Sequence, residues 1–247
     1  MNILLTNDDG YNQEGINVLK ALLKNYGNVY VVAPSMAKSG ASSSLTLRKK
    51  LKYVRHDVYN YELDGTPVDC VCFGLNALGV QFDLVVSGCN NGFNLSFDSV
   101  YSGTLGACFQ SMVGKIKTFA FSTDIDSFEI VKENGKKVID FIFDNNLLSN
   151  DHILNINFPI KTWKEIKGIK ITKQYFRDVT YEFHLDENEV YSFRNIIGDG
   201  DDEDYDTVAT KNGYVSITPL QRTSFSDNLY KKMKGEIIWK KDFCYHY

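Results

Sequence analysis

The sequence predicts an α/β fold with a mostly parallel sheet and a β-rich C-terminal extension. In about residues 1–160, short apolar runs alternate with segments of helical apolar spacing, which is typical of strand–helix–strand units. From about residue 161 to 247, polar and apolar residues alternate, which is typical of antiparallel strands. No internal repeat or Pro/Ser-rich linker divides the 247 residues, so we expect a single domain over 1–247.

The first strand–helix–strand unit occupies about the first 33 residues. The apolar run 3–5 predicts a buried strand ending in a polar turn, and the run 29–33 predicts a second one closed by Pro34. Between them, apolar residues at helical spacing predict a helix over about 16–23, which Gly27 ends.

The remaining core elements follow the same alternation. Thr66 before Pro67 is typical of a helix start, and the run 84–86 predicts a third buried strand that leads into an irregular segment, 87–104. The other core predictions are strands within 51–64 and at 118–122 and 153–157, and helices at about 103–114 and 126–145.

The C-terminal part is predicted to consist of antiparallel strands. Four segments have the alternating pattern: 169–176, 179–185, 189–197 and 213–218. The acidic run 199–206 predicts a solvated hairpin tip, because it lacks the Gly and the final Glu of a calcium-binding loop.

Composition excludes several classes of protein. With 27 Lys and Arg against 31 Asp and Glu, the net charge of −4 does not suit a protein that coats a nucleic-acid polymer. No apolar run approaches the roughly 18 residues of a membrane span, and the N-terminus has no basic signal-peptide region. The five cysteines lack Cys-x2-Cys spacing and are predicted to be reduced thiols. We therefore expect a cytoplasmic protein.

Polar residues concentrate after three of the predicted strands. In an open parallel sheet, ligands bind outside the carboxyl ends of the strands, so these residues are the candidate site. The three groups are Asn7, Asp8 and Asp9; Ser39 and Gly40; and Ser87, Gly88, Asn90, Asn91, Gly92, Asn94, Ser102, Gly103 and Thr104.

Asp8 and Asp9 are adjacent carboxylates after a buried strand. They repel each other, so a positive charge is expected to offset them. Oxygen ligands suit Mg²⁺ or Mn²⁺, and nearby Ser and Asn oxygens would complete an octahedron. The alternative is that one Asp caps the next helix or stabilises a turn.

The segment 87–106 ends at a predicted helix start around Ser102, Gly103 and Thr104. Backbone N–H groups and two hydroxyls there can form a phosphate cradle, although an ordinary helix cap beside a Gly-rich loop gives the same pattern. Ser39 and Gly40, with the serines that follow, are either a second anion-binding loop or a flexible one.

Common catalytic motifs are absent from the sequence. It has no P-loop, no dinucleotide-binding Gly-x-Gly-x-x-Gly after the first strand and no Gly-x-Ser-x-Gly elbow. The four histidines, at 56, 152, 184 and 246, lie outside the three polar clusters and are interpreted as surface or packing residues. Chemistry without a well-placed histidine indicates a metal-activated water as nucleophile.

In combination, these residues resemble the SurE family of metal-dependent 5′/3′-nucleotidases over nearly the whole chain. The resemblance is carried by the motifs ILLTNDDG at 3–10, VVAP at 31–34, SGAS at 39–42, GTPVDCV at 65–71, DLVVSGCN at 83–90, YSGT at 101–104, LNINFP at 154–159 and GYVSITPL at 213–220. Departures are modest: Phe82 stands where the family usually has Pro, and Cys89 where it usually has Ile.

The resemblance implies a three-layer, Rossmann-like core and an octahedral divalent metal, Mg²⁺ or Mn²⁺. It implies that the metal ligands are Asp8, Asp9, Ser39 and Asn90, and that substrate phosphate is contacted by Asn94, Ser102, Gly103 and Thr104. Asn7 and Gly40, at the first two strand ends, join the candidate substrate-binding residues. The resemblance also implies a homodimer or homotetramer that exchanges C-terminal elements, with the hairpin supplied by about 185–220.

The function implied is hydrolysis of nucleoside 5′- and 3′-monophosphates to nucleoside and inorganic phosphate. In this hypothesis the metal activates a water, Asp8 or Asp9 orients or deprotonates it, and the helix start at 102–104 stabilises the phosphoryl oxygens. Two alternatives stay open: hydrolysis of short polyphosphate at the same site, and a nucleotide-binding regulator without chemistry.

Overall fold

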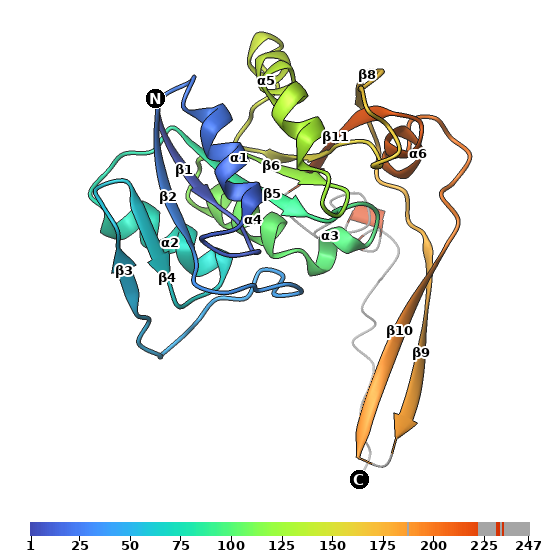
Figure 1. Ribbon diagram of the computed structural model, residues 1–247, viewed down its shortest axis with the longest axis horizontal. Coiled ribbons are helices and arrows are strands. Elements are labelled where there is room, and N and C mark those ends of the chain that lie inside the picture. Colours follow the sequence, from blue (N-terminus) through green and yellow to red (C-terminus); the bar gives the residue numbers. More distant parts are fainter. Residues whose placement is uncertain (187, 222–230, 233, 235–247) are drawn as a thin grey trace.

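The computed structural model describes residues 1–247 except 187, 222–230, 233 and 235–247, and it has the predicted α/β architecture (Figure 1). Among the described residues, no helix is long and apolar enough to cross a bilayer. The helices are α1 Glu14–Leu23, α2 Pro67–Ala77, α3 Asp98–Tyr101, α4 Gly103–Val113, α5 Phe128–Asp144 and α6 Asp206–Lys211. The strands are β1 Asn2–Thr6, β2 Asn28–Pro34, β3 Tyr53–Arg55, β4 Asn60–Leu63, β5 Leu84–Asn91, β6 Lys117–Thr123, β7 His152–Asn157, β8 Gly168–Ile171, β9 Asp178–Asp186, β10 Glu189–Ile197 and β11 Tyr214–Gln221.

Nine strands form one mixed sheet in the order β3-β4-β2-β1-β5-β6-β7-β11-β8. The central strands β4, β2, β1, β5, β6 and β7 are mutually parallel, and β3 and β11 are antiparallel to their neighbours β4 and β7. The chain passes from β1 to β2 on one side and later returns to pair β5 on the other side of β1. The sheet therefore reverses its order of strands between β1 and β5, and ligands of open α/β sheets bind at such a switch point.

Helices cover both faces of the sheet, which makes three layers. α1 and α5 pack on each other on one face over a buried cluster that includes Ile3, Leu5 and Phe119. α2 and α4 pack on each other on the opposite face, over Leu4 and Val85. Alternate residues of β1 therefore face the two layers, as expected for a strand buried on both sides.

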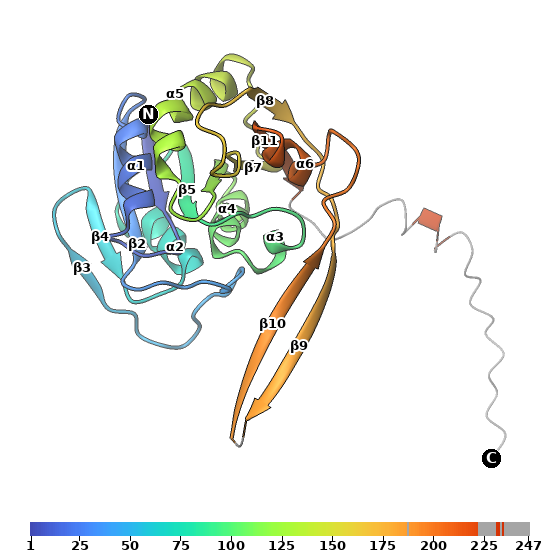
Figure 2. The ribbon, with the colours of Figure 1, turned by 45° about the vertical axis from the view of Figure 1, so that its right-hand side comes forward.

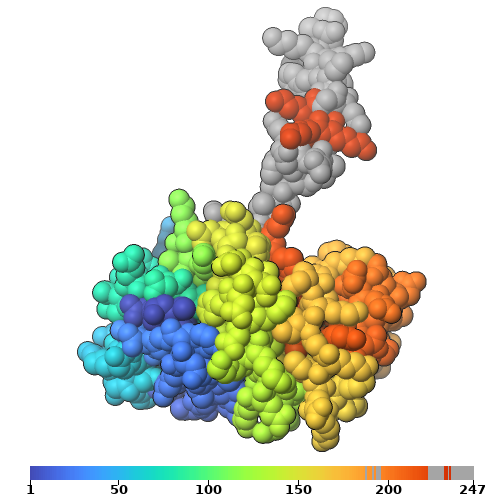
Figure 3. Space-filling view, turned by 90° about the horizontal axis from the view of Figure 1, so that it is seen from above, coloured from blue at the N-terminus to red at the C-terminus, as the bar shows by residue number. Residues whose placement is uncertain are grey.

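The C-terminal part joins the same sheet through β11. β11 runs antiparallel to β7, as predicted, and β8 lies outside it. In the space-filling view the orange residues of this part lie directly against the yellow-green residues of α5 (Figure 3). The prediction of an antiparallel strand over 169–176 is wrong, because β8 covers only Gly168–Ile171 and pairs with β11 in parallel.

β9 and β10 form a separate two-stranded hairpin that projects from the body (Figure 2). The prediction of a hairpin tip at 199–206 is wrong: the strands turn between Asp186 and Glu189, and the acidic run connects β10 to α6. Three of its acidic side chains form ion pairs: Asp199 with Arg177 and Lys211, Asp202 with Lys173, and Glu203 with Lys170. The projecting hairpin spans 178–197, which corrects the predicted range of 185–220.

The irregular segment 87–104 is more ordered than the sequence predicted. β5 continues to Asn91, and a short helix, α3, precedes α4. The described cysteines, Cys70, Cys72, Cys89 and Cys108, are free thiols, and Cys244 and His246 lie outside the described residues.

Candidate metal and phosphate site

The polar turn after β1 places Asp8 and Asp9 at the switch point of the sheet. The side chain of Asn7 forms this turn: its Nδ2 donates to the carbonyl of Gly10 (2.9 Å) and its Oδ1 accepts from the Gly10 N–H (3.2 Å). Asn7 is fully buried and both its polar atoms are occupied. Its position therefore supports a role in fixing the two carboxylates.

Asp8 is a buried carboxylate held against the start of α4. The hydroxyl of Thr104 donates to its Oδ1 at 2.5 Å, and a methyl group on Gly103 would come within 2.9 Å of its Cβ. Burial raises the pKa of Asp8 to about 6, and the charge of Asp9 adds to the rise, while the Thr104 hydrogen bond opposes it. Among the described residues, no cation is one of the main contributions to this pKa.

Asp9 is half-buried beside Asp8. Its Oδ2 accepts from the backbone N–H of Asn91 at 3.0 Å, which ties the end of β1 to the end of β5. Burial raises the pKa of Asp9 as well, against that hydrogen bond. A cavity of about 310 Å³ opens beside Asp9, and it is lined by Asp9, Gln13, Glu14, Ala37, Asn91, Asp126 and Phe128.

The loop after β2 brings Ser39 to the same corner. The N–H of Lys38 donates to the backbone carbonyl of Asp8 at 2.7 Å, which ties the loop to the turn after β1; the next residue, Ser39, is exposed. Gly40 adopts a φ of 74°, where no other residue is unstrained, and turns the loop toward α3. There Ser42 donates from its N–H and hydroxyl to the carbonyls of Tyr101 and Val100.

Asn90, the residue before the last of β5, has its amide orientation fixed. Its Nδ2 donates to the carbonyl of Gly92 at 2.7 Å. Within the described residues its Oδ1 accepts no hydrogen bond, so this oxygen is available to a ligand.

These donors fit a hard divalent cation. They are two carboxylates, an amide oxygen and a hydroxyl, all oxygens, and the carboxylates form no ion pair with a described residue. Within the described ranges, no group of three or more His, Cys, Asp and Glu side chains gathers at one point. Two carboxylates with neutral oxygens and room for water is the arrangement that Mg²⁺ and Mn²⁺ accept.

Of the predicted phosphate residues, Gly103 and Thr104 at the start of α4 contact Asp8. Ser102 caps α4, because its hydroxyl accepts from the N–H of Leu105, and the N–H groups of Gly103 and Thr104 open the helix toward the carboxylates. Asn94 is buried, and its Nδ2 donates to the hydroxyl of Ser122 at 2.8 Å. A phosphate contact from this nitrogen would require that bond to be exchanged.

Several supporting residues carry no signal of their role in the sequence. The side chain of Asn157 accepts from the N–H of Asn94, and the side chain of Asn155 donates to the carbonyl of Asn94. The end of β7 therefore holds the loop that carries Asn94. Two amide side chains inside an otherwise apolar buried strand were the available hint. Asp69 completes the capping box that Thr66 begins at the start of α2. It also accepts hydrogen bonds from the N–H and hydroxyl of Thr46, which anchors the end of the Ser39 loop.

The described histidines lie away from the carboxylates. His56 stacks on Tyr11 at 4.6 Å between ring centroids and pairs with Glu62, and His152 contacts the carbonyl of Leu147. His184 is an exposed residue of the β9–β10 hairpin.

The fold and the candidate site together define an α/β protein with clustered oxygen donors at the switch point of a mostly parallel sheet. The model of the family described as survival protein SurE matches residues 3–181, and the chain belongs to this family. It is 40% identical over 228 residues to a protein of Histophilus somni (strain 2336) named 5′-nucleotidase SurE, covering 90% of this chain and 92% of that one. A Petrotoga mobilis protein of the same name is 38% identical over 237 residues, covering 89% and 92%.

A crystal structure of the SurE protein from Aquifex aeolicus has the same fold. The TM-score is 0.84 at 35% identity, and the match covers 95% of this chain and 99% of the other. The similarity therefore includes the C-terminal elements as well as the parallel core.

Proposed function

We propose that this protein is a metal-dependent phosphomonoesterase that hydrolyses nucleoside 5′- and 3′-monophosphates to nucleoside and inorganic phosphate. The observation that carries the proposal is the pair Asp8 and Asp9, without a cationic partner among the described residues, facing the start of α4. Relatives named 5′-nucleotidase over about nine-tenths of the chain support the substrate class.

The proposed metal ligands are Asp8, Asp9, Ser39 and Asn90, with Mg²⁺ or Mn²⁺ as the ion. When bound, the ion would supply a water of lowered pKa and would neutralise charge on the phosphoryl group. The hydroxyl of Thr104 donates to Oδ1 of Asp8, and the N–H of Asn91 donates to Oδ2 of Asp9, which fixes the orientation of both carboxylates.

The start of α4 is the proposed phosphoryl-binding element. The N–H groups of Gly103 and Thr104 point to where Asp8 lies and are free of the helix ladder, as in the first turn of any α-helix. Preorganised N–H donors stabilise charge that develops on phosphoryl oxygens. Gly40 leaves open space above the loop, since a methyl group there would meet nothing within 4 Å.

Release of inorganic phosphate tests this proposal. AMP, 3′-AMP, p-nitrophenyl phosphate and short polyphosphate are each supplied with Mn²⁺, with Mg²⁺ and with EDTA. We expect metal-dependent release from both nucleotides. Release from polyphosphate alone would assign the protein to exopolyphosphatases, and binding of AMP without any release would assign it to regulators.

Substitution of the carboxylates locates the activity. Asp8→Asn and Asp9→Asn are each expected to lower kcat by at least about 100-fold, because each removes a charged ligand and leaves the fold intact. Asp151→Asn, at an exposed aspartate just before β7 and so at the amino ends of the parallel strands, is the matched control and should retain full activity. Wild-type rates in both site variants would refute the assignment.

We also propose a homodimer or homotetramer that uses the β9–β10 hairpin. Directly paired residues of the two strands share a face, so Phe183, Leu185, Val190 and Ile196 lie on one face of the hairpin. Their side chains are 65%, 85%, 57% and 41% exposed, and a bare two-stranded hairpin is marginally stable in water. Light scattering on the full chain tests the proposal, and the 28.1 kDa mass of one chain would contradict it.

We further propose that the chain forms a single domain and works in the cytoplasm. The first statement is supported by the placement of β8 and β11 in the same sheet as β1–β7. The second is supported by four described cysteines that are free thiols, three of them buried. A small phosphate ester is the expected partner, and neither a membrane nor a nucleic-acid polymer is.

A further inference from the structure

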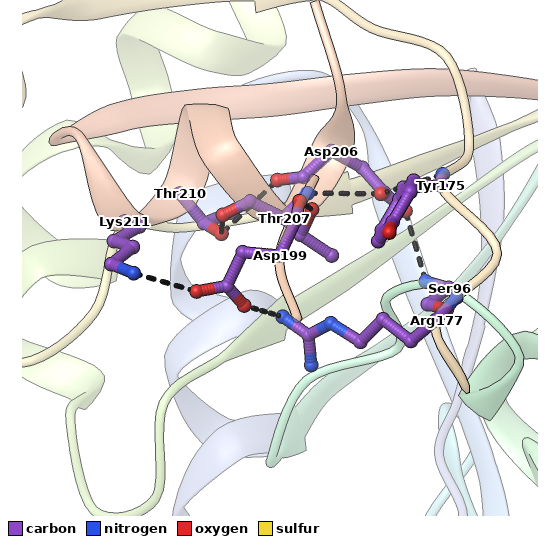
Figure 4. Close-up of polar contacts among 8 residues, drawn as sticks. All are labelled: Ser96, Tyr175, Arg177, Asp199, Asp206, Thr207, Thr210 and Lys211. Carbon is purple, nitrogen blue, oxygen red and sulfur yellow. Dashed lines mark hydrogen bonds and ion pairs between the residues drawn. The ribbon is translucent and has the colours of Figure 1, made fainter. Parts of the chain in front are cut away.

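Asp206 is a fully buried carboxylate that no step of the proposed reaction uses. It begins α6, and its two oxygens accept three backbone N–H groups from three places in the chain (Figure 4). Oδ2 accepts from Ser96 at 3.0 Å, and Oδ1 accepts from Tyr175 at 3.1 Å and from Thr207 at 2.9 Å. Only the last of these bonds is local to α6, so the other two join separate segments of the chain.

Ser96 is the residue on which these segments converge. Its φ of 55° is unusual for a residue with a side chain, and its side chain is buried. All its polar groups are held: the N–H by Asp206, the carbonyl by Nε2 of Gln174, and the hydroxyl by the N–H of Arg177 at 3.0 Å. Three residues of the C-terminal part thus fix a backbone conformation that the chain alone disfavours.

The position of Ser96 connects this contact to the site. Two residues earlier, Asn94 is anchored to β6 and β7. After Ser96 the chain forms α3 and then the cap of α4, and Gln174 also donates to the hydroxyl of Ser99 in α3 at 2.6 Å. The start of α4 therefore depends on a loop whose middle is held by Asp206 and Gln174.

The same network closes the base of the hairpin. Arg177 lies just before β9 and Asp199 just after β10, and they pair at 2.8 Å (Figure 4). Lys211 of α6 pairs with the other oxygen of Asp199 at 2.6 Å. Asp199 itself has no bond to Ser96, which makes it a useful comparison.

We propose that Asp206 and Gln174 are positioning residues for phosphate binding. They hold Ser96 so that the start of α4, with Ser102, Gly103 and Thr104, stays aligned on the phosphoryl group. This inference rests on the proposed function for the identity of the ligand. It assigns to the C-terminal part a role in the chemistry of a site built from the first 104 residues.

Binding of inorganic phosphate in the presence of Mn²⁺, measured by calorimetry, tests the inference without turnover. Asp206→Asn keeps the size of the side chain but cannot accept three N–H groups, because one oxygen is replaced by a donor. We expect the Kd for phosphate to rise about tenfold, since small misplacements of binding groups are costly. The Kd for Mn²⁺ alone should stay at the wild-type value, because Asp206 contacts none of the proposed ligands.

Two further variants separate positioning from stability. Gln174→Ala removes only the hydrogen bonds to Ser96 and Ser99. It should raise the phosphate Kd about threefold, which corresponds to the net free energy of about one hydrogen bond. Asp199→Asn breaks the ion pairs of the same network and should leave the phosphate Kd unchanged.

An unchanged phosphate Kd in Asp206→Asn overturns the inference, as does an equal rise in Asp199→Asn. If Asp206→Asn does not fold, Gln174→Ala decides by the same criterion. Failure of the proposed function has a different signature, because the wild-type protein would then release no phosphate from nucleotides.

Discussion

The surroundings of two buried aspartates, Asp8 and Asp69, shift their pKa values in opposite directions. Burial disfavours the charged form of Asp69, but hydrogen bonds from Thr46 and Thr66 outweigh that cost and lower its pKa. Asp8 has a single side-chain donor, Thr104, and burial raises its pKa to about 6. The protein therefore stabilises the charged form of Asp69. The charged form of Asp8 is destabilised, and a bound cation would offset that cost.

This difference predicts opposite effects on the stability of metal-free protein. The folded state binds a proton at Asp8 more tightly than the unfolded state, whose pKa is near 3.8. Stability is therefore lost as the pH rises from about 4 to about 6, and the full loss is present above that range. Asp8→Asn should raise the free energy of unfolding at pH 7.5 by on the order of 1–3 kcal/mol. The gain should shrink as the pH falls from 6 toward 4, where wild-type Asp8 becomes neutral.

Urea unfolding in EDTA measures this effect. Asp69→Asn is the control of opposite sign: its pKa is lowered, so its contribution to stability is present above the unfolded pKa, and the variant should lose about 1–3 kcal/mol at pH 7.5. A loss of stability in Asp8→Asn at pH 7.5 would contradict our account of the site.

Individual residues of the site differ in how far the sequence reveals them. Asp8 and Asp9 were predictable because they follow a buried strand directly, and strand ends are where ligands bind. Asp206 was not, because it is one of several acids in a polar run and its partner Ser96 lies 110 residues earlier. Its role depends on tertiary contacts that no local pattern encodes.

At the scale of elements, helix α4 packs against both Asp8 and the Ser39 loop. Two of its glycines permit this close packing: Gly103 lies against Asp8, and Gly106 lies against the loop. A methyl group on Gly106 would lie 2.2 Å from the carbonyl oxygen of Ser42 and 3.1 Å from Cα of Ser43. Both are backbone atoms, so Gly106→Ala must push the loop away from the helix. The loop carries Ser39, the proposed metal ligand.

Gly106→Ala is therefore expected to weaken Mn²⁺ binding about tenfold, the usual cost of disturbing the support of a metal ligand. Calorimetric titration with Mn²⁺ gives the Kd. Gly114→Ala, at the other end of α4, meets mainly the flexible end of Leu75 and should bind Mn²⁺ as the wild type does. Equal affinity in Gly106→Ala would remove Ser39 from the ligand set.

The sequence predicted the elements that have a long run or stripe of apolar residues. It did not predict very short elements, or strand pairings between distant parts of the chain. The strands at 3–5 and 29–33 and the helix at 126–145 are found close to their predicted positions. α3 and α6 have four and six residues and show no helical periodicity over so short a span. The parallel pairing of β8 with β11 joins residues more than 40 positions apart, so the alternating pattern could not fix its direction.

At the scale of the whole molecule, the β9–β10 hairpin is the feature that one chain leaves incomplete. The hairpin projects from the body (Figures 1 and 2). Its apolar side chains are exposed, and its base is bonded to the loop that leads into α4. A second copy of the chain is the proposed cover for this face. The hairpin thus connects assembly to the position of Ser96.

Leu185→Asp places a charge on the most exposed apolar side chain of that face and should dissociate the assembly to a single chain. The protomer should keep its fold, because Leu185 lies near the hairpin turn and outside the core clusters. Thr180→Asp puts the same charge on the opposite face of the same strand and should leave the assembly intact. Light scattering gives the mass of each variant, and a Leu185→Asp protein with the wild-type oligomeric mass would exclude this face as the interface.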